Sequence, residues 1–559
     1  MRGRGLCGEL LTAMALLLTA AGCATARTAT PPPNPSVAPT RISYPAFAPT
    51  ATPAPLVSAP GWAEGATLYL VFVRSFYDSD GDGTGDLAGL IEKLDYLNDG
   101  DPATHDDLGV TAIWLLPIFS AASYHGYDTL DHFTIQPEYG TREDLIRLVE
   151  ECHRRGIRVV LDFVMAHVSN QHPFFAEAYG NPGSPYSDWF TWYDEAHTKY
   201  KAFGNIAIVP SLNGDSPAVV EYMLEVARYW MDLDSDGDYT DGIDGFRCDH
   251  AIGVPHAAWK RLRTEVKRLR PDFWLLGEVW DKAPVIARYY DDEFDSTFDF
   301  PLHDVLSGQS ESVGHGVLGG SEPPGLIEAA LLQRGRLYPW GAQSVVFLNN
   351  HDTNRIMSVV QGDEARARLA ATVLFSLPGI PLVYYGEEIG MAGVKGDGRP
   401  YWDEYRREPM DWYADESGPG MCTWFRPADC NNRPNDGISV EEQRADPSSL
   451  LAHYRRLIAL RSAYPALRSP GHERVAVSSA HKQVYAFLRQ DAQEHILVVL
   501  NCSREATQAT LDLASSSLPS GPWRATDLLT GAEYPAVSEG EYALELAGET
   551  GVILLLQRP

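Results

Sequence analysis

The part of the chain from about residue 61 to 465 repeats one pattern, in which a short apolar run is followed by a longer amphipathic stretch. Eight of these runs are predicted strands, at residues 68–73, 111–116, 158–162, 242–248, 274–277, 297–300, 344–348 and 380–384. Helical patterns lie between them, as at 144–155, 218–231 and 259–270. Eight β units with helical spacers predict an α/β fold, a (β/α)8 TIM barrel rather than a doubly wound sheet.

Two parts of the chain depart from this pattern. Residues from about 168 to 215, after the third strand, are rich in aromatics, Gly, Pro and Asn, and they predict a small inserted subdomain. A helix at 450–461 is expected to close the barrel, whose domain then spans 61–465. Short apolar runs at 475–477, 484–488, 496–500 and 552–555 predict a separate C-terminal antiparallel β-domain over residues 466–559.

The N-terminus has the features of an export signal. Arg2 and Arg4 precede an apolar run at 10–21, which is too short to span a bilayer but suits a signal peptide. The run ends in Ala-Ala-Gly-Cys23, which resembles a bacterial lipobox. We therefore expect a signal peptide at 1–22, lipidation of Cys23 and an exported, lipid-anchored protein at the cell surface. The alternative is a plain secretory signal and a secreted protein.

Residues 23–60 are expected to form an extended tether, because ten prolines among Ala, Thr and Ser occupy positions 28–60. We expect no membrane contact other than the lipid anchor. The chain has 45 Lys+Arg against 75 Asp+Glu, a formal net charge of −30, which argues against nucleic acid as a partner. A neutral ligand is allowed. In an exported protein, Cys422 and Cys430 are close enough in sequence to form a disulfide.

Charged residues end four of the predicted strands, at the edge where a barrel collects its reactive groups. In a strand, Arg247 and Asp249 point to one face, whereas Cys248 points away toward the helices. Acids that end apolar strands are costly unless they are paired or functional. The sequence therefore predicts that charged groups converge on one pocket, drawn from Asp162 and His167, Arg247 and Asp249, Glu278, and His351 and Asp352.

These ordered motifs resemble those of glycoside hydrolase family 13, the α-amylase family, and the likeness extends from about Trp62 to the C-terminus. Further matches are Tyr-His-Gly-Tyr-Asp at 124–128, Pro-Glu-Tyr-Gly at 137–140, the segment 378–387 and Arg-Glu-Pro-Met-Asp-Trp at 407–412. The resemblance implies a retaining glycosidase that cleaves α-1,4-glucosidic bonds in starch-type glucans or maltooligosaccharides. We expect the protein to be a monomer.

The resemblance also implies the site residues. Asp249 corresponds to the nucleophile that forms a glycosyl-enzyme, Glu278 to the general acid and base, and Asp352 to a third acid that holds sugar hydroxyls. Arg247 would keep Asp249 ionised, because a nearby cation lowers the pKa of a carboxylate. The expected substrate-binding residues are Tyr127, Asp162, His167, Arg247, His351 and Arg355.

A second signal is the acidic run Asp78, Asp80, Asp82, Thr84 and Asp86, interleaved with glycines. Alternating carboxylates in a tight loop supply the oxygen ligands that Ca²⁺ prefers, although the run lacks the position-12 Glu of an EF-hand. The resemblance implies a calcium loop here, with Thr84 binding through its carbonyl. A similar run at 232–238 is a second candidate.

Some positions depart from the family pattern. Ala166 stands where many amylases have a calcium-binding Asn, and Ile252 and Gly253 stand where many have Lys and His beyond the cleaved bond. Ser211 and His250 are also unusual at their positions. Specificity is therefore open. The alternatives are an α-glucan transglycosylase, a trehalose synthase-type isomerase, an α-glucosidase or, outside enzymes, a surface glucan-binding protein.

Overall fold

The computed structural model describes residues 59–398, 401–480, 482–538 and 540–559. The predicted signal peptide, Cys23 and all but the last two residues of the predicted tether lie outside these ranges. None of the helices in the described ranges combines the length and the hydropathy needed to span a bilayer.

Eight parallel strands form the barrel, in the order β8-β7-β6-β5-β2-β1-β10-β9. A parallel bridge between Phe298 and Val345 joins the two ends of this order. The predicted barrel is confirmed, and the strand ends differ from the predicted ones by at most three residues. The strands are β1 (Leu68–Val71), β2 (Ala112–Leu115), β5 (Arg158–Phe163), β6 (Gly245–Cys248), β7 (Trp274–Gly277), β8 (Ser296–Thr297), β9 (Val345–Phe347) and β10 (Ile380–Tyr384).

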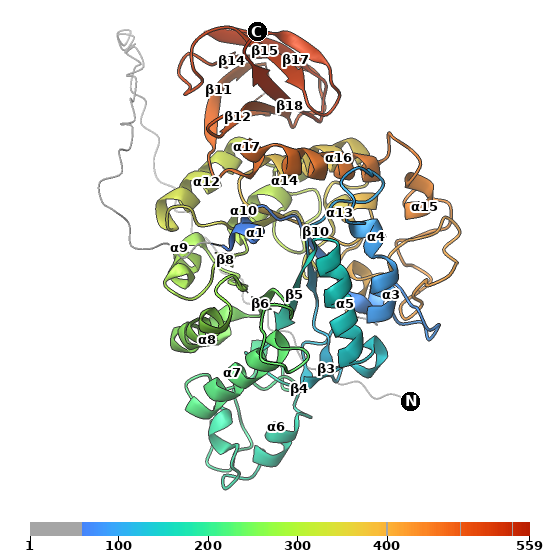
Figure 1. Ribbon diagram of the computed structural model, residues 1–559, viewed down its shortest axis with the longest axis vertical. Helices are drawn as coiled ribbons and strands as arrows, with labels where there is room; N and C mark the ends of the chain where they lie inside the picture. The colour runs from blue at the N-terminus through green and yellow to red at the C-terminus, as the bar shows by residue number, and fades with distance from the viewer. Residues whose placement is uncertain (1–58, 399–400, 481, 539) are drawn as a thin grey trace, which may run out of the picture. The chain divides into compact units, whose positions relative to one another are not determined.

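Helices surround these strands, with α5 and α8 on opposite sides of them in Figure 1. Helix α5 shows why such segments fold: Thr141 and Asp144 form a capping box, and Leu145, Leu148, Val149 and Cys152 make one buried face. The helices are α1 (Gly61–Glu64), α2 (Val73–Phe76), α3 (Leu87–Glu92), α4 (Leu94–Leu97), α5 (Arg142–Arg154), α6 (Pro173–Ala178), α7 (Pro217–Met231), α8 (His256–Leu269), α9 (Ala283–Ile286), α10 (Phe300–Ser307), α11 (Gly316–Gly319), α12 (Gly325–Leu337), α13 (Ile356–Val359), α14 (Glu364–Ser376), α15 (Val440–Gln443), α16 (Leu450–Ala463) and α17 (Pro465–Arg468).

Two features lie beside the carboxyl ends of the strands. A hairpin of β3 (Phe119–Ala121) and β4 (Thr129–Ile135), which the sequence did not predict, carries Tyr127 in its connection. Residues 168–215 contain α6 and pair with the barrel through an isolated bridge between His167 and Ser211. Both features bring side chains to the mouth of the barrel.

The C-terminal strands form one antiparallel sheet in the order β16-β15-β18-β13-β12-β11-β14-β17, which confirms the predicted β-domain. The sequence missed β14 to β17. The strands are β11 (Glu473–Ser479), β12 (Val484–Gln490), β13 (His495–Asn501), β14 (Thr507–Asp512), β15 (Trp523–Asp527), β16 (Glu533–Val537), β17 (Glu541–Leu546) and β18 (Thr550–Gln557).

A buried arginine, Arg489, connects this sheet to the barrel, and a second one, Arg461, shares the Leu467 carbonyl with it. Arg489 of β12 donates hydrogen bonds to the carbonyl oxygens of Ser376 (2.6 Å) and Leu467 (3.0 Å). Arg461 of α16 donates to those of Phe375 (3.0 Å) and Leu467 (2.8 Å). The carbonyls at the end of α14, which lack helical partners, are thus satisfied from two neighbouring elements.

Candidate active site

The predicted charged cluster forms at the carboxyl ends of β5, β6, β7 and β9. Asp162 of β5 pairs in register with Arg247 of β6, and Asp249 follows β6 directly. Glu278 comes one residue after β7, and Asp352 lies in the loop after β9. Parallel strands end at the same edge of a barrel, so residues far apart in sequence meet there.

Arg247 is the centre of this cluster, with only 1% of the residue exposed. Its Nη1 lies 2.8 Å from Asp162 Oδ1 and 2.7 Å from Asp249 Oδ1, and its Nη2 forms an ion pair with Glu278. The guanidinium also lies 5.0 Å from the centre of the Trp114 ring. One cation therefore contacts three carboxylates and fixes their relative positions.

The two carboxyl groups expected to react are both buried. Burial raises the pKa of Glu278, with Arg247 opposing the shift and the negative charges of Asp249 and Asp352 adding to it. The backbone N–H of His250 donates to Glu278 Oε2 at 2.8 Å. Burial also raises the pKa of Asp249, against the lowering effect of Arg247. Arg247 therefore favours the ionised form of Asp249, as predicted, but burial outweighs it before substrate binds.

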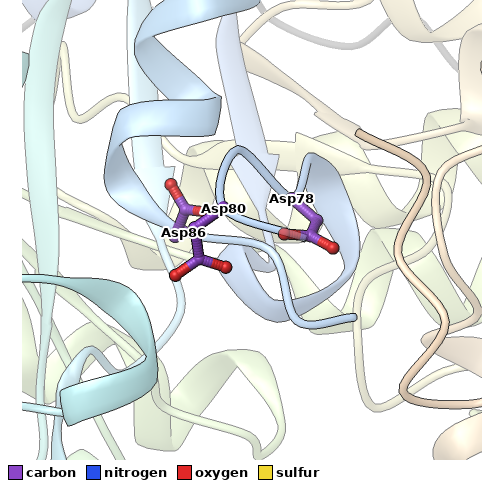
Figure 2. A group of neighbouring side chains, drawn as sticks. All are labelled: Asp78, Asp80 and Asp86. Atoms are coloured by element: carbon purple, nitrogen blue, oxygen red, sulfur yellow. The ribbon is translucent and has the colours of Figure 1, made fainter. Parts of the chain in front are cut away.

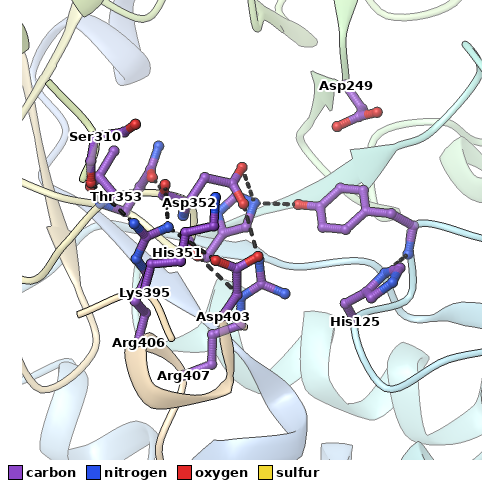
Figure 3. A network of polar contacts seen from close by, with 12 residues as sticks. His125, Asp249, Ser310, His351, Asp352, Thr353, Lys395, Asp403, Arg406 and Arg407 are labelled. Carbon is purple, nitrogen blue, oxygen red and sulfur yellow. Dashed lines mark hydrogen bonds and ion pairs between the residues drawn. The ribbon is translucent and has the colours of Figure 1, made fainter. Parts of the chain in front are cut away.

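Asp352 has a different environment. Burial alone would raise its pKa, but His351, Arg407 and Arg247 outweigh burial and hold the pKa below its ordinary value. His351 Nε2 lies 3.1 Å from one oxygen of Asp352, and Arg407 Nη2 lies 3.0 Å from the other. Figure 3 shows these residues in one network with Asp403, and Asp249 to one side. Asp352 is therefore an ionised carboxylate, and its side chain is 32% exposed.

Tyr127 joins the hairpin to the strand ends. Its hydroxyl donates to Asp162 Oδ2 at 3.1 Å and lies 2.7 Å from His351 Nε2. The Tyr127 and His351 rings are stacked, with centres 5.5 Å apart and planes within 8°. The structure therefore brings Tyr127, Asp162 and His351 together, as the sequence predicted.

His167 lies at the contact between the barrel and residues 168–215. Its ring centre is 4.9 Å from that of Phe203, which also packs edge-on against His250 at 4.7 Å. Burial lowers the pKa of His167 to about 3, so its imidazole is neutral. His167 therefore lies beside His250, the residue that follows Asp249.

Arg355, an expected substrate-binding residue, has partners in the backbone of neighbouring loops. It is 1% exposed and donates to the carbonyl oxygens of Tyr385 (2.7 Å) and Arg406 (2.9 Å). Its guanidinium also packs over the ring of Tyr384 at 4.4 Å. Arg355 therefore supports the loops that carry Tyr385 and Arg406.

Three residues of the site were not predicted from the sequence, namely Arg407, Asp403 and Phe203. Arg407 stands in the segment 407–412, whose likeness to the family was a usable signal for a role at the site. Asp403, 3.7 Å from Arg407, and Phe203 come from irregular segments and had no comparable signal.

The predicted calcium loop follows α2, at the end of β1. Oxygens of Asp78, Asp80 and Asp86 lie within 4.8 Å of one another (Figure 2). The backbone N–H groups of Gly81 and Gly83 donate to Asp78, at 2.7 and 2.8 Å. These bonds hold the carboxylate in place and leave further lone pairs for a cation, so the donor set fits Ca²⁺.

The other predicted ligands of this loop are placed differently. Asp82 accepts a hydrogen bond from the Thr84 N–H at 2.7 Å, and it is not part of the group of three converging carboxylates. The second acidic run also folds into a group, formed by Asp232, Asp234 and Asp236.

The predicted disulfide between Cys422 and Cys430 is wrong, because both are free thiols. Cys422 is buried, and burial raises the pKa of its thiol. Cys430 is half-buried and instead lies 3.4 Å from the Asn432 carbonyl oxygen and 3.4 Å from Arg433 Nη1. Proximity in sequence did not orient the two side chains toward each other.

A (β/α)8 barrel with clustered acids at the carboxyl ends of its strands is typical of glycoside hydrolases. Residues 70–470 match the family described as alpha amylase, catalytic domain, and residues 475–551 match the maltogenic amylase C-terminal domain. The chain therefore belongs to the α-amylase family and is a glycosidase of that type.

Individual relatives agree with this assignment. Alpha-amylase 3 of Dictyoglomus thermophilum is 35% identical over 464 residues, which cover 79% of this chain and 86% of that protein. Neopullulanase 2 of Thermoactinomyces vulgaris is 32% identical, over 89% of this chain and 78% of that protein. The crystal structure of the alpha-amylase from H. orenii superposes with a TM-score of 0.75 at 35% identity, covering 88% of this chain and 99% of that one.

Proposed function

We propose that this protein hydrolyses α-1,4-glucosidic bonds in starch-type glucans or maltooligosaccharides, with retention of configuration. The observation that carries the proposal is the bridge of Arg247 between Asp249 and Glu278. It holds two carboxyl groups side by side at the barrel mouth, which is the arrangement that a retaining glycosidase needs.

In the first step, a carboxylate oxygen of Asp249 attacks the anomeric carbon. Glu278 donates its proton to the leaving glycosidic oxygen as the bond breaks, and a covalent glycosyl-enzyme forms. In the second step, Glu278 takes a proton from water, the water oxygen attacks the same carbon, and Asp249 is released as a carboxylate. Glu278 is then protonated again and ready for the next cycle.

The surrounding residues position the sugar. The ionised Asp352, held by His351 and Arg407, accepts hydrogen bonds from hydroxyls of the reacting ring. Tyr127 offers its ring face to that sugar, and the imidazoles of His167 and His351 bond to hydroxyls. Asp162 keeps Arg247 in place.

Specificity on the leaving-group side is the open part of this proposal. Ile252, which is 42% exposed, and Gly253 offer no charged group to a sugar there. Relatives named alpha-amylase and neopullulanase are similarly close in identity, so the family alone does not choose among substrates. A product profile on starch, maltotriose and maltose tests the proposal.

The expected product profile is a rise in reducing ends from starch, with mixed short maltooligosaccharides. New sugars from maltose or maltotriose without a net rise in reducing ends would identify a transglycosylase or an isomerase. Glucose alone, released from chain ends, would identify an α-glucosidase. Absence of turnover on all three substrates would contradict the proposal and favour the glucan-binding alternative.

The pH dependence of kcat/KM is expected to be bell-shaped, because Glu278 must be protonated while Asp249 is ionised. Activity falls at high pH as Glu278 loses its proton and at low pH as Asp249 gains one. Burial raises the pKa of both groups. The high-pH limb of the profile is therefore expected above the ordinary pKa of Glu, about 4.3, and the low-pH limb above that of Asp, about 3.9. Rates on soluble starch across about pH 4 to 9 measure this. A high-pH limb that persists in Glu278→Gln would contradict the assignment.

We propose calcium as the cofactor of the loop formed by Asp78, Asp80 and Asp86, which would hold the ion through their carboxylates. An ion there would stabilise the fold of the loop beside β1 without entering the reaction. Chelation by EDTA is expected to lower Tm by several degrees, because a ligand at 100 times its Kd stabilises a protein by about 2.7 kcal/mol. Differential scanning calorimetry measures the shift.

Asp80→Asn should weaken this response to calcium, whereas the control Asp95→Asn, whose side chain is 70% exposed, should keep it. An unchanged Tm after chelation of the wild-type protein would contradict calcium binding.

We propose that the protein is exported and anchored at the cell surface through a lipid on Cys23, with secretion as the alternative. The support is the apolar run at 10–21 followed by Ala-Ala-Gly-Cys23 and the Pro-rich segment. The catalytic body would act as a monomer on external glucan, and its net charge of −30 suits a neutral substrate better than nucleic acid. Radiolabelled palmitate incorporation that is lost in Cys23→Ala would test the anchor.

A further inference from the structure

Asp411 is a buried carboxylate outside the reaction described above. It is 1% exposed, and within the described ranges no hydrogen-bond donor reaches either of its oxygens. Oε1 of Glu416 is also buried without a donor. Buried carboxylate oxygens almost always have a partner, so three such atoms in one place need an explanation.

The surroundings of this pair are acidic. The negative charges of Glu416, Asp436 and Glu442 all act on Asp411. Among the described ion pairs, one includes a residue of this pair of acids. Arg426 Nη1 lies 3.2 Å from Oε2, the other oxygen of Glu416. Asp436 and Glu442 already accept backbone N–H groups, so the unsatisfied oxygens belong to Asp411 and Glu416 alone.

A proton shared between the two carboxyls is the simplest alternative. Burial, contact with Glu416 and the nearby negative charges raise the pKa of Asp411 to about 9, so the protein without a bound ion would hold a proton there. One proton, however, joins one donor oxygen to one acceptor oxygen. It leaves the third of the three buried oxygens without a partner, whereas a cation bound by both carboxylates would offer a partner to each of them.

We propose that Asp411 and Glu416 bind a divalent cation, with Ca²⁺ as the preferred ion. All the free ligand atoms are carboxylate oxygens, which hard cations prefer, and calcium accepts carboxylates in flexible geometry where magnesium demands a near-ideal octahedron. The site shares no residue with the loop of Asp78, Asp80 and Asp86, so it would bind a separate ion.

The position of the site suggests what the ion does. The Asp411 carbonyl accepts a hydrogen bond from the Val440 N–H at 2.9 Å, at the start of α15. Between these residues, the N–H groups of Thr423 and Trp424 donate to the Gly83 carbonyl at 2.8 and 3.0 Å. A cation at Asp411 would therefore hold the long segment 411–440 closed and pressed against the Asp78 loop.

Calcium counting on the full chain tests the proposal. The protein is stripped with EDTA, desalted and titrated with CaCl₂ by calorimetry, and bound calcium is measured by atomic emission. The variants are Asp411→Asn and Glu416→Gln, with Asp80→Asn for the other loop and Asp95→Asn as an exposed control. We expect Asp411→Asn and Glu416→Gln each to bind one calcium ion fewer than the wild type, and Asp95→Asn to bind the same number.

A shared proton gives the opposite result. The amide introduced by Asp411→Asn would supply the missing donor to Glu416, so this variant would bind as much calcium as the wild type with an equal or higher Tm. That outcome would overturn the proposal. Should Asp411→Asn fail to fold, Glu416→Gln decides, because its side chain is at the edge of the site and 9% exposed. An unchanged calcium number in Glu416→Gln would also overturn it.

Discussion

Asp249→Asn is expected to lower kcat on maltooligosaccharides by about 10⁴-fold or more, because an amide oxygen is too weak a nucleophile to form the glycosyl-enzyme. The fold should survive, since Asn is isosteric with Asp and still accepts a hydrogen bond from Arg247, now 2.7 Å from Asp249 Oδ1. Initial rates from reducing-end assays, measured beside circular dichroism spectra, check both expectations.

The control is Asp106→Asn, a side chain that is 66% exposed and is ion-paired with Arg444, outside the cluster around Arg247. It should keep the wild-type rate. A loss of less than about tenfold in Asp249→Asn would show that another carboxylate attacks the sugar. A large loss accompanied by unfolding would instead point to the buried ion pairs of Arg247, and Tm separates these two cases.

Glu278→Gln is expected to lower kcat on maltooligosaccharides by about 10²- to 10⁴-fold, the usual contribution of a general acid. The loss should be much smaller on α-maltosyl fluoride, because fluoride leaves without being protonated. Burial raises the pKa of Glu278, which favours the protonated form, and Gln has no such proton to give. Comparing kcat on maltooligosaccharides and on α-maltosyl fluoride, in the wild type and in Glu278→Gln, therefore separates the effect on proton transfer from the effect on binding.

Asp249→Asn is the matched control for this comparison, since a nucleophile is needed for either leaving group and both substrates should suffer alike. Equal losses on the two substrates in Glu278→Gln would mean that Glu278 acts through the geometry of Arg247 and Asp249. An unchanged rate on maltooligosaccharides would exclude Glu278 as the acid.

The barrel was predictable because its strands are buried on both faces and are nearly continuous in apolar residues. The β3–β4 hairpin was missed for the opposite reason. Strand β3 has three residues, and β4, with the sequence TLDHFTI, is buried only at every third residue and has no clear apolar run. In β17, EYALEL, every second residue is exposed, which lowers the mean hydropathy of the segment.

In the candidate site too, residues at the ends of strands were predictable and residues of irregular segments were not. Asp162, Arg247, Asp249 and Glu278 were predictable because strands of one parallel barrel end at one edge. Arg407 and Asp403 come from the long segment after β10, whose path follows tertiary contacts and has no periodicity to reveal it. The backbone partners of Arg355 were also hidden, because the sequence does not show which way a loop side chain points.

Arg489, the buried arginine that connects the C-terminal sheet to the barrel, affects how this enzyme can be shortened or combined with other domains. Arg489 belongs to β12 but completes the end of α14, a barrel helix, through the Ser376 carbonyl. A shortened chain that stops after α17 would leave this helix end to solvent beside the buried Arg461. The catalytic barrel therefore depends on the C-terminal sheet for this contact, and a chimera with a foreign C-terminal domain needs another hydrogen-bond donor for the Ser376 carbonyl.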